Sequence, residues 1–324
     1  MSVHADIPTV YVMMATYNGE KYLCEQIESI LSQKDVNVTL RISDDCSMDN
    51  TMELLRKYAD NNSNMIVTQN TKNLGVALNF MQMVYEVDYK AYDYYAFSDQ
   101  DDVWLPEKML IAIRKIKNKE QDPSHKELKD YGIPVLYCSD LVDVDADLTN
   151  PRRELAKIRL SLTKRGNPLV RNWFSGCTMV FNQELAHLAN YYKLNNFPRI
   201  HDVWMFLVAF YCANVIVDMH HALILRRITG DNIAGELNTS YDIRRASIRH
   251  LKKPPTHNIC RCAKQLFDGY KEFIDDKDKQ LISAIANYAA SPRIRLQLFF
   301  SSAFRQPSLA ADFLMRVKFL LGRF

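Results

Sequence analysis

Hydrophobic runs rich in Val, Ile and Tyr alternate with segments of helical period through residues 1–120. Strands are predicted at residues 9–16, 38–43, 65–70 and 92–98. Helices are predicted after Asn18, after Ser47 or Asp49, and at residues 75–87 and 106–118, with the three named side chains as candidate caps. This order predicts an α/β fold in which helices cover a parallel sheet.

The pattern is less regular after residue 120. It predicts a strand or hairpin at 135–147, a polar and basic loop at 151–172, a strand at 177–182, helices at 183–192 and 201–213, and two short strands at 215–219 and 222–227. Beyond residue 238 the pattern turns helical and basic. We therefore predict one domain at 1–238, with halves at 1–120 and 121–238, and a C-terminal helical region at 239–324.

Polar side chains follow each of the first four predicted strands. Because ligands bind at the carboxyl ends of strands in open α/β sheets, these side chains should converge on one crevice. They are Thr16, Tyr17, Asn18, Asp44, Asp45, Asn70 and the acidic run from Asp99 to Asp102.

The acidic run ends the aromatic fourth strand, where adjacent carboxylates repel one another unless a cation is present. In an extended chain Asp99 and Asp101 share one face, while Gln100 and Asp102 point the other way. Such a carboxylate pair can hold Mg²⁺ or Mn²⁺. The plain alternative is an acidic surface turn. Asp44 and Asp45 could accept the imide N–H of a uracil or thymine, or one of them could cap a helix.

Composition narrows the class of protein. At 324 residues and 48% hydrophobic content the chain should be globular. The start of the chain shows no secretory signal pattern, and the longest apolar stretch, 203–217, falls short of the ~18 residues of a membrane span. Seven cysteines fit a reducing cytoplasm better than a disulfide framework, and Cys260 with Cys262 is a weak zinc signal.

The net charge of +3 hides an asymmetry. Residues 1–240 hold 25 basic and 31 acidic side chains, a net −6, whereas residues 241–324 hold 16 and 7, a net +9. The acidic body and the lack of a nucleic-acid-binding motif argue against a nucleic-acid partner. In the tail, an apolar face at helical spacing beside basic residues favours an anionic membrane surface, with packing on its own domain or on a partner chain as the alternative. This face consists of Leu309, Phe313, Leu314, Val317, Leu320 and Leu321.

A family resemblance rests on four motifs in the first half: MMATYNGEKYLCEQIESILSQ, RISDDCSMDNT, NLGVALNF and FSDQDDVWLPEK. Three more, FSGCTMVFN, HDVW and LRRITGDNIAG, extend it to about residue 235. The pattern resembles glycosyltransferase family 2, and within it the bacterial rhamnosyltransferases that build cell-surface polysaccharides. The resemblance implies the GT-A fold, with a mixed, mainly parallel sheet, and an inverting, metal-dependent sugar transfer from a nucleotide-diphospho-sugar.

The resemblance also implies residue roles. Asp202 matches the catalytic base, although a carboxylate that begins an apolar helix is also a good cap. Asp99 and Asp101 would hold Mg²⁺ or Mn²⁺. The donor would contact Thr16, Tyr17, Asn18, Asp44, Asp45, Asn73, Gly75, Asp99, Gln100 and Arg227. The acceptor side would comprise Trp104, Trp173, Phe174, Gly176 and His201, with core packing as the alternative for Trp104.

One departure from the family pattern bears on activity. Relatives usually carry Gln-His where this chain has Ile228 and Thr229, so the role of that His is missing or has passed to Arg226, Arg227 or His201. The expected function is rhamnosyl transfer from dTDP-rhamnose to a glycan or lipid-linked acceptor, at the cytoplasmic face of the cell membrane. The alternatives are a hexosyltransferase that uses a UDP-sugar, and a degenerate sugar-nucleotide-binding or scaffold protein. A homodimer is left open.

Overall fold

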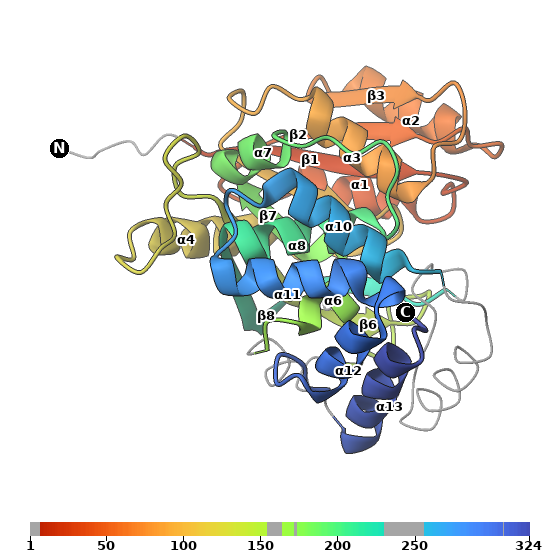
Figure 1. The fold of residues 1–324 in the computed structure, drawn as a ribbon. Coiled ribbons are helices and arrows are strands. Elements are labelled where there is room, and N and C mark those ends of the chain that lie inside the picture. The colour runs from red at the N-terminus through yellow and green to blue at the C-terminus, as the bar shows by residue number, and fades with distance from the viewer. Residues whose placement is uncertain (1–6, 154–163, 172–173, 230–255, 307) are drawn as a thin grey trace. The chain divides into compact units, whose positions relative to one another are not determined.

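The computed structural model describes residues 7–153, 164–171, 174–229, 256–306 and 308–324 (Figure 1). The chain divides into two compact units, unit 1 with Met1–Glu154 and Phe174–Arg227, and unit 2 with Leu155–Trp173 and Ile228–Phe324. The predicted boundary at 238/239 lies outside the described residues. The sequence pattern did not predict that residues 164–171 belong with the C-terminal unit.

Unit 1 is built on a sheet with the order β3-β2-β1-β4-β7-β6-β8-β5. β1 to β4 pair in parallel, as predicted, whereas β7 runs antiparallel to both β4 and β6. β8 is parallel to β6 and antiparallel to the short β5. The strands are β1 Thr9–Thr16, β2 Asn37–Asp44, β3 Met65–Gln69, β4 Tyr94–Ser98, β5 Val103–Trp104, β6 Val135–Val144, β7 Met179–Asn182 and β8 Asn214–Arg227.

The helices of unit 1 follow the predicted order. They are α1 Leu23–Leu31, α2 Thr51–Asn61, α3 Val76–Glu86, α4 Lys108–Glu120, α7 Gln183–Ala189 and α8 His201–Cys212. The predicted caps of α1 and α2 are wrong. Asn18 lies before α1 in a left-handed conformation, and its Oδ1 accepts from the N–H of Met48 at 2.8 Å. The cap position of α2 belongs to Asn50.

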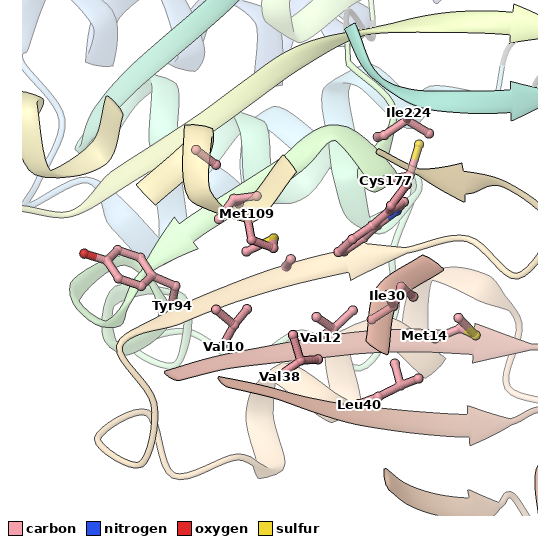
Figure 2. Close-up of a cluster of buried hydrophobic side chains, with 14 of the residues drawn as sticks. Val10, Val12, Met14, Ile30, Val38, Leu40, Tyr94, Met109, Cys177 and Ile224 are labelled. Atoms are coloured by element: carbon pink, nitrogen blue, oxygen red, sulfur yellow. The ribbon is translucent and has the colours of Figure 1, made fainter. Parts of the chain in front are cut away.

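The central strands β1 and β4 are buried on both faces, as expected for parallel strands covered by helices, whereas the edge strand β3 is largely exposed. Alternate residues of β1 enter a cluster with neighbouring strands and with α1 and α4. Figure 2 shows this cluster, with labelled members Val10, Val12, Met14, Ile30, Val38, Leu40, Tyr94, Met109, Cys177 and Ile224. The other alternate side chains of β1, Tyr11 and Met13, are buried as well, so the apolar runs of the first strands reflect two packed faces.

Residues 135–144 form one strand, which is one of the two predicted alternatives. Two details of the sheet differ from prediction. The two short strands predicted at 215–219 and 222–227 are one strand, β8, whose pairing with β6 shifts register between the pairs Ser139–Asp218 and Asp140–Ala222. This bulge interrupts the apolar pattern without ending the strand. β5 was not predicted because two residues carry no periodicity.

Unit 2 is helical, as predicted. Its elements are α6 Asn167–Val170, α10 Asn258–Tyr270, α11 Asp276–Asn287, η3 Tyr288–Ala290, α12 Pro292–Phe300 and α13 Leu309–Leu320. In Figure 1, α10 runs beside α11, and α12 beside α13. Among the described helices, none combines the length and apolar character needed to cross a membrane.

Candidate active site at the carboxyl ends of β1, β2 and β4

Asp44 ends β2 as a fully buried carboxylate surrounded by donors. It accepts from the Thr16 hydroxyl at 3.0 Å and from the Gln69 amide at 3.2 Å. Both the backbone N–H and the hydroxyl of Ser47 also donate to it, at 2.9 and 2.5 Å. These bonds compensate the cost of burying the charge and join the ends of β1, β2 and β3.

Asp45, the next residue, closes the loop that follows β3. Its carboxylate accepts from the backbone N–H groups of Leu74 and Gly75, each at 2.8 Å, and from the side chain of Asn70 at 2.9 Å. The Asn73 amide donates to the Asp45 carbonyl at 3.1 Å. Gly75 has φ of 77°, a conformation that glycine adopts at little cost. Asp45, Asn73 and Gly75, which were predicted to contact the sugar-nucleotide donor, therefore lie in one hydrogen-bonded loop.

Gln100 joins the loop after β4 to the loop after β1. Its Oε1 accepts from the Tyr17 N–H at 2.9 Å, and its Nε2 donates to the Tyr17 carbonyl at 3.1 Å. Gly19 allows this approach, because a Cβ there would lie 2.4 Å from Gln100 Oε1. With its backbone held in this way, Tyr17 is left 45% exposed.

The acidic run does not continue β4 in extended form. The chain bends at Gln100 and Asp101, and Asp99 and Asp102 bring one carboxylate oxygen each into a group with the Cys177 thiol. These ligand atoms all lie within 4.8 Å of one another. The expectation that Asp102 points away from Asp99 is therefore wrong, because the period-two alternation of side chains holds only while the backbone stays extended.

The crowded carboxyl groups have raised pKa values. Burial, and then the charges of Asp101 and Asp202, raise the pKa of Asp99 to about 7. Burial and the neighbouring Asp99 raise the pKa of Asp102 well above its usual range. Burial also raises the pKa of Asp101, against the opposing effect of Arg227 and Arg226. The site thus gathers negative charge that a bound cation would stabilise.

The residues present fit a divalent metal ion. Asp102 Oδ2 is buried without a hydrogen-bond partner, and Asp99 offers a second carboxylate oxygen beside it. Mg²⁺ and Mn²⁺ prefer such oxygen ligands. The Cys177 thiol suits neither ion, since burial raises its pKa well above its ordinary value and keeps it protonated. Cys177 therefore packs against the carboxylates instead of completing a soft-metal site.

Asp202 lies in the first turn of α8, buried, with its Oδ1 accepting from the Val203 N–H at 2.5 Å. Its charge raises the pKa of Asp99, so the two carboxylates are electrostatic neighbours although they come from distant segments. The cap position of α8 belongs to Ile200, so Asp202 is a first-turn residue whose charge suits the helix N-terminus, and its role as the base stays a prediction.

His201, predicted on the acceptor side, is enclosed by aromatic rings. It stacks on Phe80 with ring centroids 3.9 Å apart and meets the edge of Phe97 at 5.0 Å. Neither ring nitrogen has a hydrogen-bond partner, and burial lowers the pKa of His201 to about 3. Gly176 touches it, since a Cβ there would lie 2.7 Å from His201 Nε2. The space beside Gly176, which was predicted on the acceptor side, is thus occupied by a side chain of α8.

The aromatic residues predicted to contact the acceptor are mostly core residues. Trp104 is 2% exposed, with Lys108 Nζ 3.5 Å from its ring centroid, so neither ring face is open to a sugar and the prediction for Trp104 is wrong. Phe174 is buried and packs against Phe206 at 5.3 Å. Trp173 lies outside the described residues.

The arginines that end β8 lie in different environments. Arg226 has a side chain 25% exposed, donates from Nε to Asp143 Oδ1 at 2.7 Å, and lowers the pKa of Asp99. Arg227, predicted to bind the donor, is 1% exposed and pairs with Glu25 of α1. The chemistry that sequence reasoning missed is at Asp102, Cys177 and Glu25. Of these, only Asp102 carried a signal, as the third acid of the run.

Part of the chain matches a known family. Residues 11–123 match the family model described as glycosyl transferase family 2. The dTDP-rhamnosyl transferase RfbG of Shigella flexneri is 42% identical over 102 residues, 31% of this chain and 35% of that protein. The UDP-Glc:alpha-D-GlcNAc-diphosphoundecaprenol beta-1,3-glucosyltransferase WfgD of Escherichia coli is 29% identical over 104 residues, 32% of this chain and 39% of that protein. The match thus spans about a third of these relatives' length.

Among solved structures, the crystal structure of S. aureus TarS 1-349 in complex with UDP-GlcNAc has a TM-score of 0.56 at 15% identity, and the alignment covers 98% of this chain and 93% of that one. This likeness assigns the fold as GT-A, as the motifs predicted. The family match covers residues 11–123, about a third of the chain, and the structural likeness adds the fold alone.

Proposed function

We propose that the protein is an inverting, metal-dependent glycosyltransferase that moves a sugar from a nucleotide-diphospho-sugar to a hydroxyl group of a cell-envelope glycan or lipid-linked acceptor. The observation that carries the proposal is the cluster in which Asp99 and Asp102 lie within 4.8 Å of the Cys177 thiol, while a Cβ at the preceding Gly176 would lie 3.5 Å from the Cβ of Asp202. It brings the candidate base beside the carboxylates that end β4, where a family 2 domain would hold the donor diphosphate.

The donor nucleotide would lie over the ends of β1 and β2. The exposed ring of Tyr17 offers a face for a base, while Gln100 fixes its backbone. Thr16, Asp44 and Asp45 engage one another and the surrounding loops, so a base contact from either carboxylate would use an additional lone pair or replace an internal donor. Asn18, Asn73 and Gly75 would shape the loops around the nucleotide.

Asp99 and Asp102, with Asp101 adjacent, would hold Mg²⁺ or Mn²⁺. A bound ion would supply charge stabilisation for the departing diphosphate. Arg226 would add a positive charge at the same place, since it is partly exposed and faces the acidic group electrostatically. We assign to Arg226 the role that the His missing at position 229 plays in relatives.

In the reaction, the acceptor oxygen forms a bond to the anomeric carbon on the face opposite the diphosphate. Asp202 takes the proton of the acceptor hydroxyl as that bond forms. The bond between the anomeric carbon and the diphosphate oxygen breaks, and its electron pair leaves with the nucleotide diphosphate. The configuration at the anomeric carbon is therefore inverted.

The donor remains a choice between two classes. RfbG is named a dTDP-rhamnosyl transferase, and its higher identity favours dTDP-rhamnose for this chain. WfgD is named a UDP-Glc enzyme, and its similarity supports a UDP-hexose as the alternative donor. The name of WfgD also includes a lipid-linked acceptor, GlcNAc-diphosphoundecaprenol, which supports an acceptor of that kind.

The C-terminal helices support attachment to an anionic lipid surface at the cytoplasmic face of the membrane. Leu309, Phe313 and Leu320 lie on one stripe of α13 and are exposed, Phe313 by 63%. Leu296 and Phe300 form a similar exposed pair on α12. The excess of basic residues beyond position 240 complements anionic headgroups.

The first experiment is hydrolysis and transfer across a panel of UDP- and dTDP-sugars with Mn²⁺ or Mg²⁺. It compares the wild-type chain with Asp202→Asn and with Asp60→Asn, a control that removes an exposed carboxylate on α2. We expect one donor to release its nucleotide diphosphate in a metal-dependent way. Transfer should be lost in Asp202→Asn and retained in Asp60→Asn. Binding of a donor without turnover, with every acceptor tested, would instead indicate a degenerate transferase.

The membrane proposal has a separate test by sedimentation with vesicles. Phosphatidylglycerol vesicles should bind the wild-type chain more tightly than phosphatidylcholine vesicles, and Phe313→Ser should weaken that binding. Ile66→Ser, which changes an exposed apolar residue of β3, is the matched control. Equal binding by Phe313→Ser and wild type would exclude α13 as the attachment site.

A further inference from the structure

Arg227 is a buried cation at the end of β8, and its Nε, Nη1 and Nη2 atoms each have a partner in unit 1. Nε donates to the carbonyl of Ala146 at 3.1 Å, and Nη1 donates to the carbonyl of Asp101 at 2.8 Å. Nη2 pairs with the Glu25 carboxylate. The guanidinium also lies 4.7 Å from the ring centroid of Tyr22. A cation this deeply buried is stable only when such partners replace water.

The same residue contacts the acidic loop twice. Besides the bond from Nη1 to the Asp101 carbonyl, the backbone N–H of Arg227 donates to Asp102 Oδ1 at 3.2 Å. This bond leaves Asp102 Oδ2 as the oxygen without a partner. Arg227 therefore sets both the path of the bend and the orientation of one carboxylate.

We propose that Arg227 is a positioning residue that braces the acidic loop at 99–102 against α1 through Glu25, and that it does not itself bind the donor. The alternation of side chains along β8 directs Arg226 and Arg227 to opposite faces, so the two adjacent arginines have different roles. Arg226 acts on the acidic group from its partly exposed position, while Arg227 holds the loop from within. The part of the proposal that concerns metal rests on the proposed function.

A lysine could not replace this arginine. The planar guanidinium reaches Ala146, Asp101 and Glu25 in three directions at once, whereas an ammonium is a single point donor on a flexible stem. Glu25 is the accessible end of the brace, with a side chain 58% exposed. Its removal should leave the core of unit 1 intact and release the guanidinium.

The experiment compares Glu25→Ala and Arg227→Lys with Glu28→Ala, a matched change one turn further along α1, where Glu28 bonds the Tyr58 hydroxyl at 2.7 Å. The first readout is amide hydrogen exchange of the peptide covering residues 99–105, with neither metal nor donor present. The second is Mn²⁺ affinity by calorimetry without donor. Circular dichroism verifies that each variant is folded, and Glu25→Ala carries the test if Arg227→Lys is not.

We expect exchange in residues 99–105 to accelerate in Glu25→Ala and Arg227→Lys but not in Glu28→Ala. Mn²⁺ affinity should fall by about tenfold, as for other groups that orient metal ligands. Unchanged exchange would overturn the brace. Faster exchange with unchanged Mn²⁺ affinity would overturn its role in positioning ligands. If the wild-type chain binds no Mn²⁺, the metal proposal fails by itself and the exchange result alone decides the brace.

Discussion

The acidic residues at the ends of β2 and β4 lie in opposite environments, although both strands flank β1 and end at the same edge of the sheet. Asp44 and Asp45 meet hydroxyl, amide and backbone N–H donors on every side. Asp99 and Asp102 meet each other, a protonated thiol and the charge of Asp202. Asp44 and Asp45 hold the loops together through hydrogen bonds, whereas Asp99 and Asp102 are placed to bind a ligand.

This difference separates stability from function. A buried carboxylate that accepts several hydrogen bonds stabilises the native state, and its loss leaves its donors unsatisfied. A buried carboxylate beside like charges costs stability and is kept where the charge has a use. Substitution at the two clusters should therefore have opposite signatures.

The largest effect is expected for Asp99→Asn. Loss of a metal-binding charge should reduce turnover by about 10³-fold, since charge stabilisation by the ion is worth several kcal/mol in the transition state. The free energy of unfolding of the metal-free protein should not fall, because a repelled charge is removed. Initial rates and urea unfolding measure the two effects. A variant that unfolds more easily and still turns over would reverse the assignment.

At the other cluster, Asp45→Ala should lower the free energy of unfolding by about 3 kcal/mol, because the donors of Asn70, Leu74 and Gly75 lose their acceptor. Urea titration measures this change. Asp60→Ala, an exposed acid of α2, is the control and should lie within about 0.5 kcal/mol of wild type. Equal stability of Asp45→Ala and the control would remove the contrast between the clusters.

His201 offers a third case, a buried titratable group without a hydrogen-bond partner. Its pKa in the folded chain is about 3, below its ordinary value of 6.5. The unfolded chain therefore binds the extra proton as pH falls from 6.5 to 3, so this residue makes stability fall over that range, by up to about 1.4 kcal/mol per pH unit. His201→Leu should make the pH dependence shallower by that amount, as measured by unfolding at a series of pH values. Parallel profiles for the two proteins would contradict this.

The smallest effect is expected at the link between the two loops. Gln100→Ala removes the paired bonds to Tyr17 and should cost about 1 kcal/mol of stability, with a rise in the KM for the donor that exceeds the change in kcat. Gly19→Ala should act alike, because its Cβ would displace the same amide. A change in kcat alone would mean that Gln100 serves the reacting groups instead of the Tyr17 loop.

Much of the fold could be predicted from the pattern of hydrophobic and polar residues. The first four strands and their helices were predicted because each is long enough to show its period, and the parallel order places their carboxyl ends together. The short β5 and the bulge in β8 were missed, since neither extends the period. Trp104 was assigned to the acceptor because an aromatic residue beside a functional motif fits a core or a binding site equally well at the sequence level.

The sequence by itself determined the α/β order, the edge of the sheet that carries the acids, and the motifs shared with family 2. Only the tertiary structure decided which acids are satisfied, that Asp102 joins Asp99, and that Arg227 is buried while Arg226 is partly exposed and pairs with Asp143. The physical reason is the separation along the sequence over which each kind of contact acts. Periodicity reports on neighbours within one element, whereas the partners that decide these roles, such as Glu25 and Arg227, lie 202 residues apart and meet only when the chain has folded.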